Sequence, residues 1–130
     1  MCSDKQKPVG SIVPGSIQTG DVENVSVISV NGYYEKELGA QVFQQADALL
    51  QKGKINFIID FSACTLINSP GVASLLTLTM KVSQDFRGRV FIVGLDALKT
   101  KVLNMAGVSS LAEIQPTLSD GLKKVKESNS

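Results

Sequence analysis

Two short apolar runs joined by a helical segment restrict the folds available to this chain of 130 residues. Residues 55–61 and 90–93 are almost continuously apolar, as expected of parallel strands that are covered on both faces of a sheet. Between them, apolar side chains recur at helical spacing and predict a helix over residues 70–85. Strand, helix and strand in this order predict a right-handed βαβ unit.

The remaining segments continue the alternation of strands and helices. A β-branched run at residues 25–30 ends at Asn31-Gly32, which predicts a strand followed by a turn. The other predicted elements are a weaker strand at 12–17, helices at 35–51 and 118–127, and a short strand at 111–114.

One more helix is predicted late in the chain, where Leu98, Val102 and Met105 recur at helical spacing. Gly107 follows and is suited to end that helix in the left-handed conformation.

Together these elements predict one α/β domain over residues 11–127, with flexible tails at residues 1–10 and 128–130. Its central sheet is expected to be mostly parallel, with four to five strands and about four helices.

The composition argues against several classes of site. The chain has no histidine, which removes the side chain best suited to acid–base chemistry and metal binding near neutral pH. Thirteen basic and twelve acidic residues leave a net charge of +1, which gives nucleic acid no field to follow. Cys2 and Cys64 have no CxxC spacing, and the glycines form no phosphate-binding loop. We therefore expect no metal, no cofactor and no nucleic-acid partner.

The sequence also contains no recognisable targeting segment. The first ten residues lack the apolar core of a signal peptide, and no apolar run approaches the roughly eighteen residues that a membrane span needs. We expect a cytoplasmic protein that does not contact the membrane.

The most informative point is Asn68-Ser69-Pro70-Gly71, where a buried strand passes into a helix. Sites in open α/β sheets usually lie at such strand ends. Ser69 is predicted to cap the helix and Pro70 to be its first residue. Ser69 is then either a structural cap or a phosphorylation site, because a helix start tolerates a phosphate and the added charge alters the surrounding surface.

Residues 55–71, followed by a helix and then residues 88–108, resemble the STAS domain of bacterial anti-sigma factor antagonists. The resemblance covers roughly residues 15–127 and includes Gly32, Gly94 and Gly107. It implies a STAS-like fold.

In that family, the serine after an aspartate at the start of the second helix is phosphorylated by a partner kinase. Ser69 occupies the matching position, although Asn68 replaces the aspartate and Pro70 departs from the family pattern. The resemblance implies Ser69 as the phosphorylation site. It further implies a partner-binding surface that comprises Gly32, Tyr33, Tyr34, Asn68, Pro70, Gly71, Val72 and Ser74.

The function implied by the resemblance is partner switching in transcription regulation, without enzymatic activity. The unphosphorylated chain would bind an anti-sigma factor or switch serine kinase, a histidine-kinase-like ATPase, and phosphorylation of Ser69 would release it. A serine phosphatase would reset the cycle, and the chain itself would be a monomer or weak dimer.

Several alternatives stay open. The chain could be a constitutive STAS scaffold or binding module that is not phosphorylated, or a small-molecule enzyme or carrier on the same fold. Tyr33 and Tyr34 could be interface anchors or could pack at the domain edge. Cys64 is expected to be an inert buried thiol, and Asp60 to have a turn or capping role.

Overall fold

The computed structural model describes residues 15–129, which form a five-stranded sheet in the order β1-β2-β3-β4-β5. Among the strands of this described part, only the β1–β2 pair is antiparallel. The strands are β1 (Ser16–Val22), β2 (Val25–Tyr34), β3 (Asn56–Ile67), β4 (Arg89–Val93) and β5 (Glu113–Gln115). The helices are α1 (Lys36–Gln51), α2 (Ser69–Met80), α3 (Ala97–Met105) and α4 (Leu118–Asn129), with a π-helical turn η2 (Lys81–Asp85) and a 3-10 turn η3 (Val108–Ser110). The predicted α/β domain with a mostly parallel sheet is confirmed.

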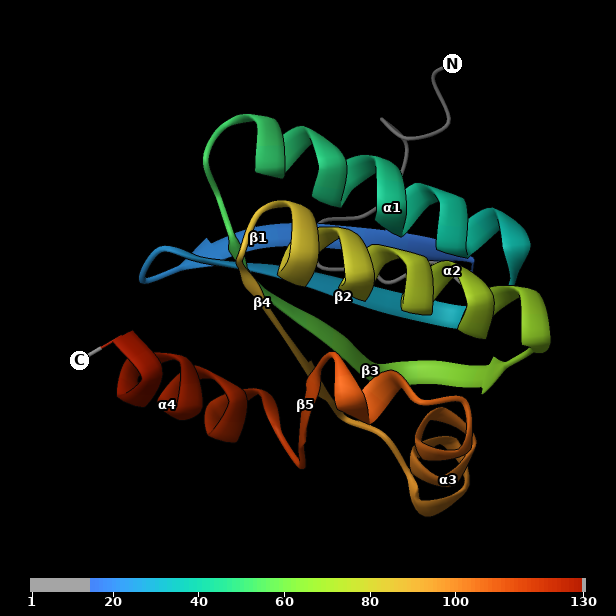
Figure 1. The fold of residues 1–130 in the computed structure, drawn as a ribbon. Coiled ribbons are helices and arrows are strands. Elements are labelled where there is room, and N and C mark those ends of the chain that lie inside the picture. Colours follow the sequence, from blue (N-terminus) through green and yellow to red (C-terminus); the bar gives the residue numbers. More distant parts are fainter. Residues whose placement is uncertain (1–14, 130) are drawn as a thin grey trace, which may run out of the picture.

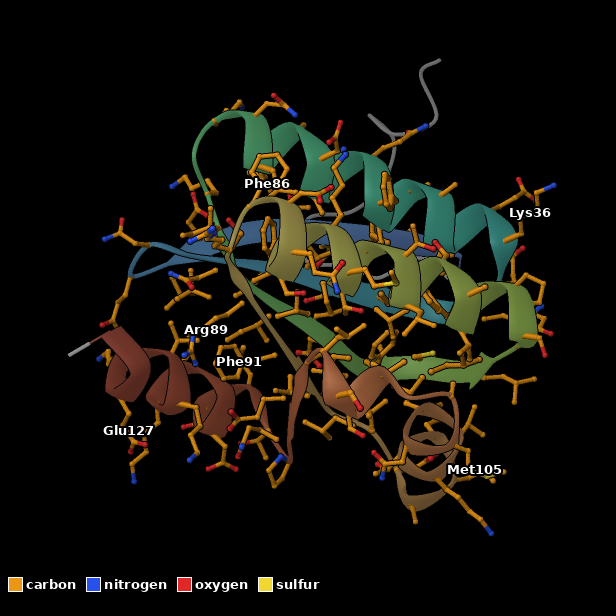
Figure 2. All side chains as sticks on the ribbon, in the orientation of Figure 1. Lys36, Phe86, Arg89, Phe91, Met105 and Glu127 are labelled. Carbon is orange, nitrogen blue, oxygen red and sulfur yellow. The ribbon has the colours of Figure 1, made fainter. Side chains whose placement is uncertain are left out.

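Helices cover both faces of this sheet. Figure 1 shows α1 and α2 together over one face, with α4 against the other. Ile59 and Ile92 are buried in the layer beneath α1 and α2, whereas Ile58 and Phe91 belong to the smaller cluster that contains Val125 of α4. Phe91 lies between the sheet and α4 in Figure 2. This burial on both faces is the reason that the central strands read as continuous apolar runs.

The first hairpin differs from the sequence prediction. The turn between β1 and β2 is formed by Glu23 and Asn24, whose φ angles are 50° and 71°. Asn31 and Gly32 do not form the predicted turn, because β2 continues through them to Tyr34. Instead the β2–β3 register shifts on either side of this pair, and Gly32 has a φ of 100°. An Asn-Gly dipeptide supplies the same left-handed backbone to a bulge as to a turn, so the local signal could not separate them.

Near both ends of the chain, the observed bounds of the elements differ slightly from the predicted ones. The predicted strand at 12–17 overlaps β1 only in its last two residues, and its first three residues lie outside the described part. The predicted tail at 1–10 also lies outside it. At the other end, the backbone of α4 remains helical to Asn129, beyond the predicted helix end at residue 127.

Helix α3 is attached to the domain differently from what its apolar spacing suggests. Leu98 is 64% exposed and Met105 is 78% exposed, while Leu103 is fully buried. Figure 2 shows Met105 on the outer side of this helix. Gly107 follows with a φ of 89°, as predicted for the helix end. The recurring apolar residues therefore lie largely on the surface, and Leu103 fixes α3 to the core.

We predict that Leu103→Ala destabilises the protein, because it removes the side chain that anchors α3 in the core. The expected loss in the free energy of unfolding is about 2–5 kcal/mol. Leu98→Ala is the matched control on the same helix, and its exposure limits the expected change to about 0.5 kcal/mol. Urea denaturation followed by circular dichroism measures both. Equal effects of the two variants would contradict this account of α3.

Candidate functional site

The candidate site lies at the carboxyl ends of β2 and β3, where the chain turns into α2. Asn68 is the N-cap of α2, with an extended backbone (φ −103°, ψ 177°), and its side-chain oxygen accepts a hydrogen bond of 2.9 Å from the Gly71 N–H. Ser69 and Pro70 are therefore the first two residues of the helix. The predictions of Ser69 as cap and Pro70 as first residue were one position late. Asparagine caps a helix as well as serine does, and here it directly follows the strand.

The predicted phosphorylation and partner-binding residues form two groups in the structure, one that is at least partly exposed to solvent and one that is buried. Ser69, Pro70 and Tyr33 are exposed, Tyr33 to 44%. The half-buried members are Asn68, Val72 and Ser74.

The other group is buried and comprises Gly32, Tyr34 and Gly71. Tyr34 has no exposed surface, so the prediction that its side chain contacts a partner is wrong. Adjacent residues of a strand point to opposite faces of the sheet, and Tyr34 takes the inward position of this pair. Gly32 and Gly71 contribute backbone geometry and close packing within the domain instead of contact surface.

Tyr34 holds the start of α2 through its main chain and its ring. Its carbonyl oxygen accepts a hydrogen bond of 3.2 Å from the Asn68 N–H. A Cβ atom on Gly71 would lie 2.3 Å from the same oxygen, so only glycine permits this approach. The Tyr34 ring packs edge-on against Phe61, with ring centroids 5.2 Å apart. The turn that carries Ser69 is thus fixed directly to the core.

The Tyr34 hydroxyl lies where α1 meets α2. Burial raises the pKa of Tyr34 far above its ordinary value, and the nearby Ser74 hydroxyl offsets this only in part. Ser74 lies close to the Tyr34 oxygen, but among residues 15–129 no group meets the geometry of a hydrogen bond to it. Gly39 lets α1 approach α2 closely at this point, because a Cβ atom on Gly39 would lie 2.7 Å from the Ser74 side chain. Ser74 therefore serves the helix–helix contact.

A groove of about 720 Å³ runs between the start of α2 and the end of α3, with Ser69 among its lining residues. Val72, Leu76, Val102 and Met105 supply much of its apolar surface, and none of its lining side chains is ionisable. A second groove of about 620 Å³ lies beside α3 next to β5 and includes Asp96 and Lys101. The first groove is not predictable from the sequence. The apolar repeat of α3 is the available signal, but such a repeat predicts a helix and does not indicate a groove beside it.

Two residues considered as chemical groups have structural roles. Cys64 is 7% exposed, and burial raises the pKa of its thiol, which donates a hydrogen bond of 3.3 Å to the Leu66 carbonyl. Asp60 accepts hydrogen bonds from the Ser62 N–H at 2.9 Å and the Ser62 hydroxyl at 2.6 Å. Across residues 15–129, no three acidic, cysteine or histidine side chains are grouped to hold a metal ion. No helix in that range has the length and apolar character to cross a membrane.

We predict that Gly71→Ala lowers the free energy of unfolding by about 1–3 kcal/mol, because the new methyl group would overlap the Tyr34 carbonyl oxygen. Gly20→Ala is the control, since a Cβ on Gly20 meets no atom within 4 Å. Its expected effect is within about 0.5 kcal/mol. Urea denaturation compares the two variants, and a Gly71→Ala protein as stable as Gly20→Ala would show that this approach is not required.

No family model and no curated protein matches the sequence. Solved structures do match. An anti-sigma factor antagonist from Mycobacterium paratuberculosis is 25% identical over 88% of this chain and 97% of its own, with a TM-score of 0.74. A putative anti-sigma factor antagonist from Thermotoga maritima is 18% identical over 85% of this chain and 94% of its own, with a TM-score of 0.76. Unphosphorylated SpoIIAA of Bacillus is 18% identical over 85% of this chain and 98% of its own, with a TM-score of 0.68. The chain therefore has the STAS fold of the anti-sigma factor antagonists, as the resemblance of its sequence to that family implies.

Proposed function

We propose that this protein is a regulatory switch that binds an anti-sigma factor or switch serine kinase and is released when Ser69 is phosphorylated. The observation that supports this most directly is the exposure of Ser69 on the first turn of α2, in a chain with the fold of the anti-sigma factor antagonists. A serine phosphatase would return the protein to its binding state.

Phosphorylation of a protein with this fold has a structural precedent. SpoIIAA is known in unphosphorylated and phosphorylated forms, which match this chain with TM-scores of 0.68 and 0.66 at 18% identity. Both forms therefore have the fold described here. A stressosome structure matches as well, with a TM-score of 0.64. These likenesses support the proposal that this chain has a role in protein assembly and signalling.

The chemistry would be divided between two proteins. The Ser69 oxygen would bond to the γ-phosphorus of ATP as the bond from that phosphorus to the β–γ bridging oxygen breaks, which releases ADP. The kinase would supply the nucleotide, its magnesium ions and the base that accepts the hydroxyl proton. This chain would supply the hydroxyl, held in place by the cap and by the Tyr34 carbonyl. We accordingly propose that the chain has no enzymatic activity of its own.

The proposed docking surface surrounds Ser69. It comprises the exposed Tyr33 and Pro70, the half-buried Asn68 and Val72, and the groove beside α2. Aromatic and apolar side chains of this kind are favoured at the centres of protein interfaces. A phosphate on Ser69 would add about two negative charges to a surface whose groove has no charged lining residue. Binding, and not folding, is the property that would change.

The second candidate is a constitutive STAS scaffold. Two observations favour it: Asn68 stands where the family has an aspartate, and Pro70 follows the serine. Asn68 provides a helix cap but no carboxylate that could attract a kinase or its magnesium. In this alternative, Ser69 is only the first residue of α2.

We predict that incubation with ATP and the cognate switch kinase adds one phosphate, at Ser69. Intact-mass and peptide mass spectrometry measure the number and position of the phosphates. Ser69→Ala should abolish the modification, whereas Ser109→Ala, at another exposed serine, should leave it unchanged. Phosphate found at a different residue, or no phosphate with a kinase that demonstrably binds the chain, would favour the scaffold.

We further predict that phosphorylation weakens kinase binding roughly a thousandfold, which corresponds to about 4 kcal/mol. Ser69→Asp, with one negative charge, should weaken it by about tenfold or more. Isothermal titration calorimetry with the same kinase measures both effects. Equal affinities of the wild type and Ser69→Asp would contradict the switch and support constitutive binding.

A further inference from the structure

The first turn of α2 has few amide groups left for a phosphate. The positive end of a helix dipole resides on the unpaired N–H groups of the first turn. Here the Gly71 N–H is bound by the Asn68 side chain, and the Val72 N–H donates to the Asn68 carbonyl. Pro70 has no N–H. Within the described chain, the N–H of Ser69 itself is the one donor of this turn that remains.

Among the described residues, neither α2 itself nor the lining of the adjacent groove supplies a cation beside Ser69. All twelve residues of α2 are uncharged, and none of the side chains that line the adjacent groove ionises. On α3, Lys99 is paired with Asp96 at 2.7 Å, and Lys101 lines the groove on the other side of the helix. Before α1, the Glu35 carboxylate accepts hydrogen bonds from backbone N–H groups of its own helix, and Lys36, the first residue of α1, is exposed to solvent.

We infer that a phosphate on Ser69 is not bound by helix α2 and stands at the edge of the α2–α3 groove, with its charge uncompensated by α2 or by the residues that line the groove. Pro70 and the Asn68 cap together deny the phosphate the amide donors that a helix start ordinarily provides. The inference rests on the proposed function in one respect, namely that Ser69 is the residue that becomes phosphorylated.

The consequence concerns how the switch acts. A phosphate bound by α2 would be partly neutralised and would stabilise the helix. An unbound phosphate leaves α2 unchanged and keeps its full charge at the edge of an apolar groove. A partner that places an apolar side chain in this groove would have to remove water from the dianion, which is unfavourable. Release would then follow from the local surface alone.

The test uses the full chain with phosphoserine installed at position 69 during translation, so that no kinase is needed. Titration followed by ³¹P nuclear magnetic resonance should give a phosphate pKa close to the ordinary value of about 6. A phosphorylated peptide of residues 65–73 provides the unstructured reference. Pro70→Ala in the phosphorylated chain restores an N–H at the second helical position. This variant should lower the phosphate pKa by about 0.2–0.7 units relative to the unsubstituted phosphorylated chain.

A phosphate pKa one unit or more below that of the peptide would overturn the inference. A midpoint of thermal unfolding that is higher with the phosphate than without it would do so too, and this measurement requires no substitution. Because the phosphate is installed directly, failure of a kinase to modify Ser69 would count against the proposed function alone. A strongly lowered phosphate pKa together with normal kinase modification would count against the inference alone.

Discussion

The arrangement of the site depends on one backbone oxygen, the carbonyl of Tyr34. It accepts the Asn68 N–H at the end of β3, and Gly71 packs directly against it in the first turn of α2. The parallel pairing of β2 with β3 brings this carbonyl to the start of the helix. A buried carbonyl that is hydrogen-bonded on one side and closely packed on the other leaves little freedom to the segment between. The position of Ser69 is therefore set by the sheet and not by a loose loop.

Much of the fold could be predicted because its strongest signals are local. The strands at 55–61 and 90–93 are covered on both faces, so their burial appears as continuous apolar sequence. The bulge at Asn31-Gly32 could not be predicted, since the same dipeptide serves turns and bulges and only the pairing with β3 distinguishes them. Helix α3 shows the limit of periodicity: its spacing identified a helix but did not reveal which side faces the core.

The site was predictable in its position but not in its internal roles. A strand end followed by Asn-Ser-Pro-Gly indicated the start of α2, and Ser69 is exposed there. The cap was assigned one residue too late because asparagine and serine cap equally well and the length of β3 was underestimated. The orientation of Tyr34 depends on strand alternation through a bulged region, which sequence spacing alone does not determine. The requirement for glycine at position 71 is not visible in the local sequence, because it arises from the carbonyl of Tyr34, which is far from Gly71 in the sequence but adjacent in space.

Helix α3 has a groove on each side and one fully buried apolar side chain. An element held in this way can tilt or slide at a lower energetic cost than α1 or α2, whose contacts extend along their lengths. The groove beside Ser69 thus has one wall, at the start of α2, that is tied to the sheet, and a facing wall, α3, that is held by fewer buried contacts. Any movement of α3 would change the width of the groove, while the geometry of the Ser69 hydroxyl would stay constant.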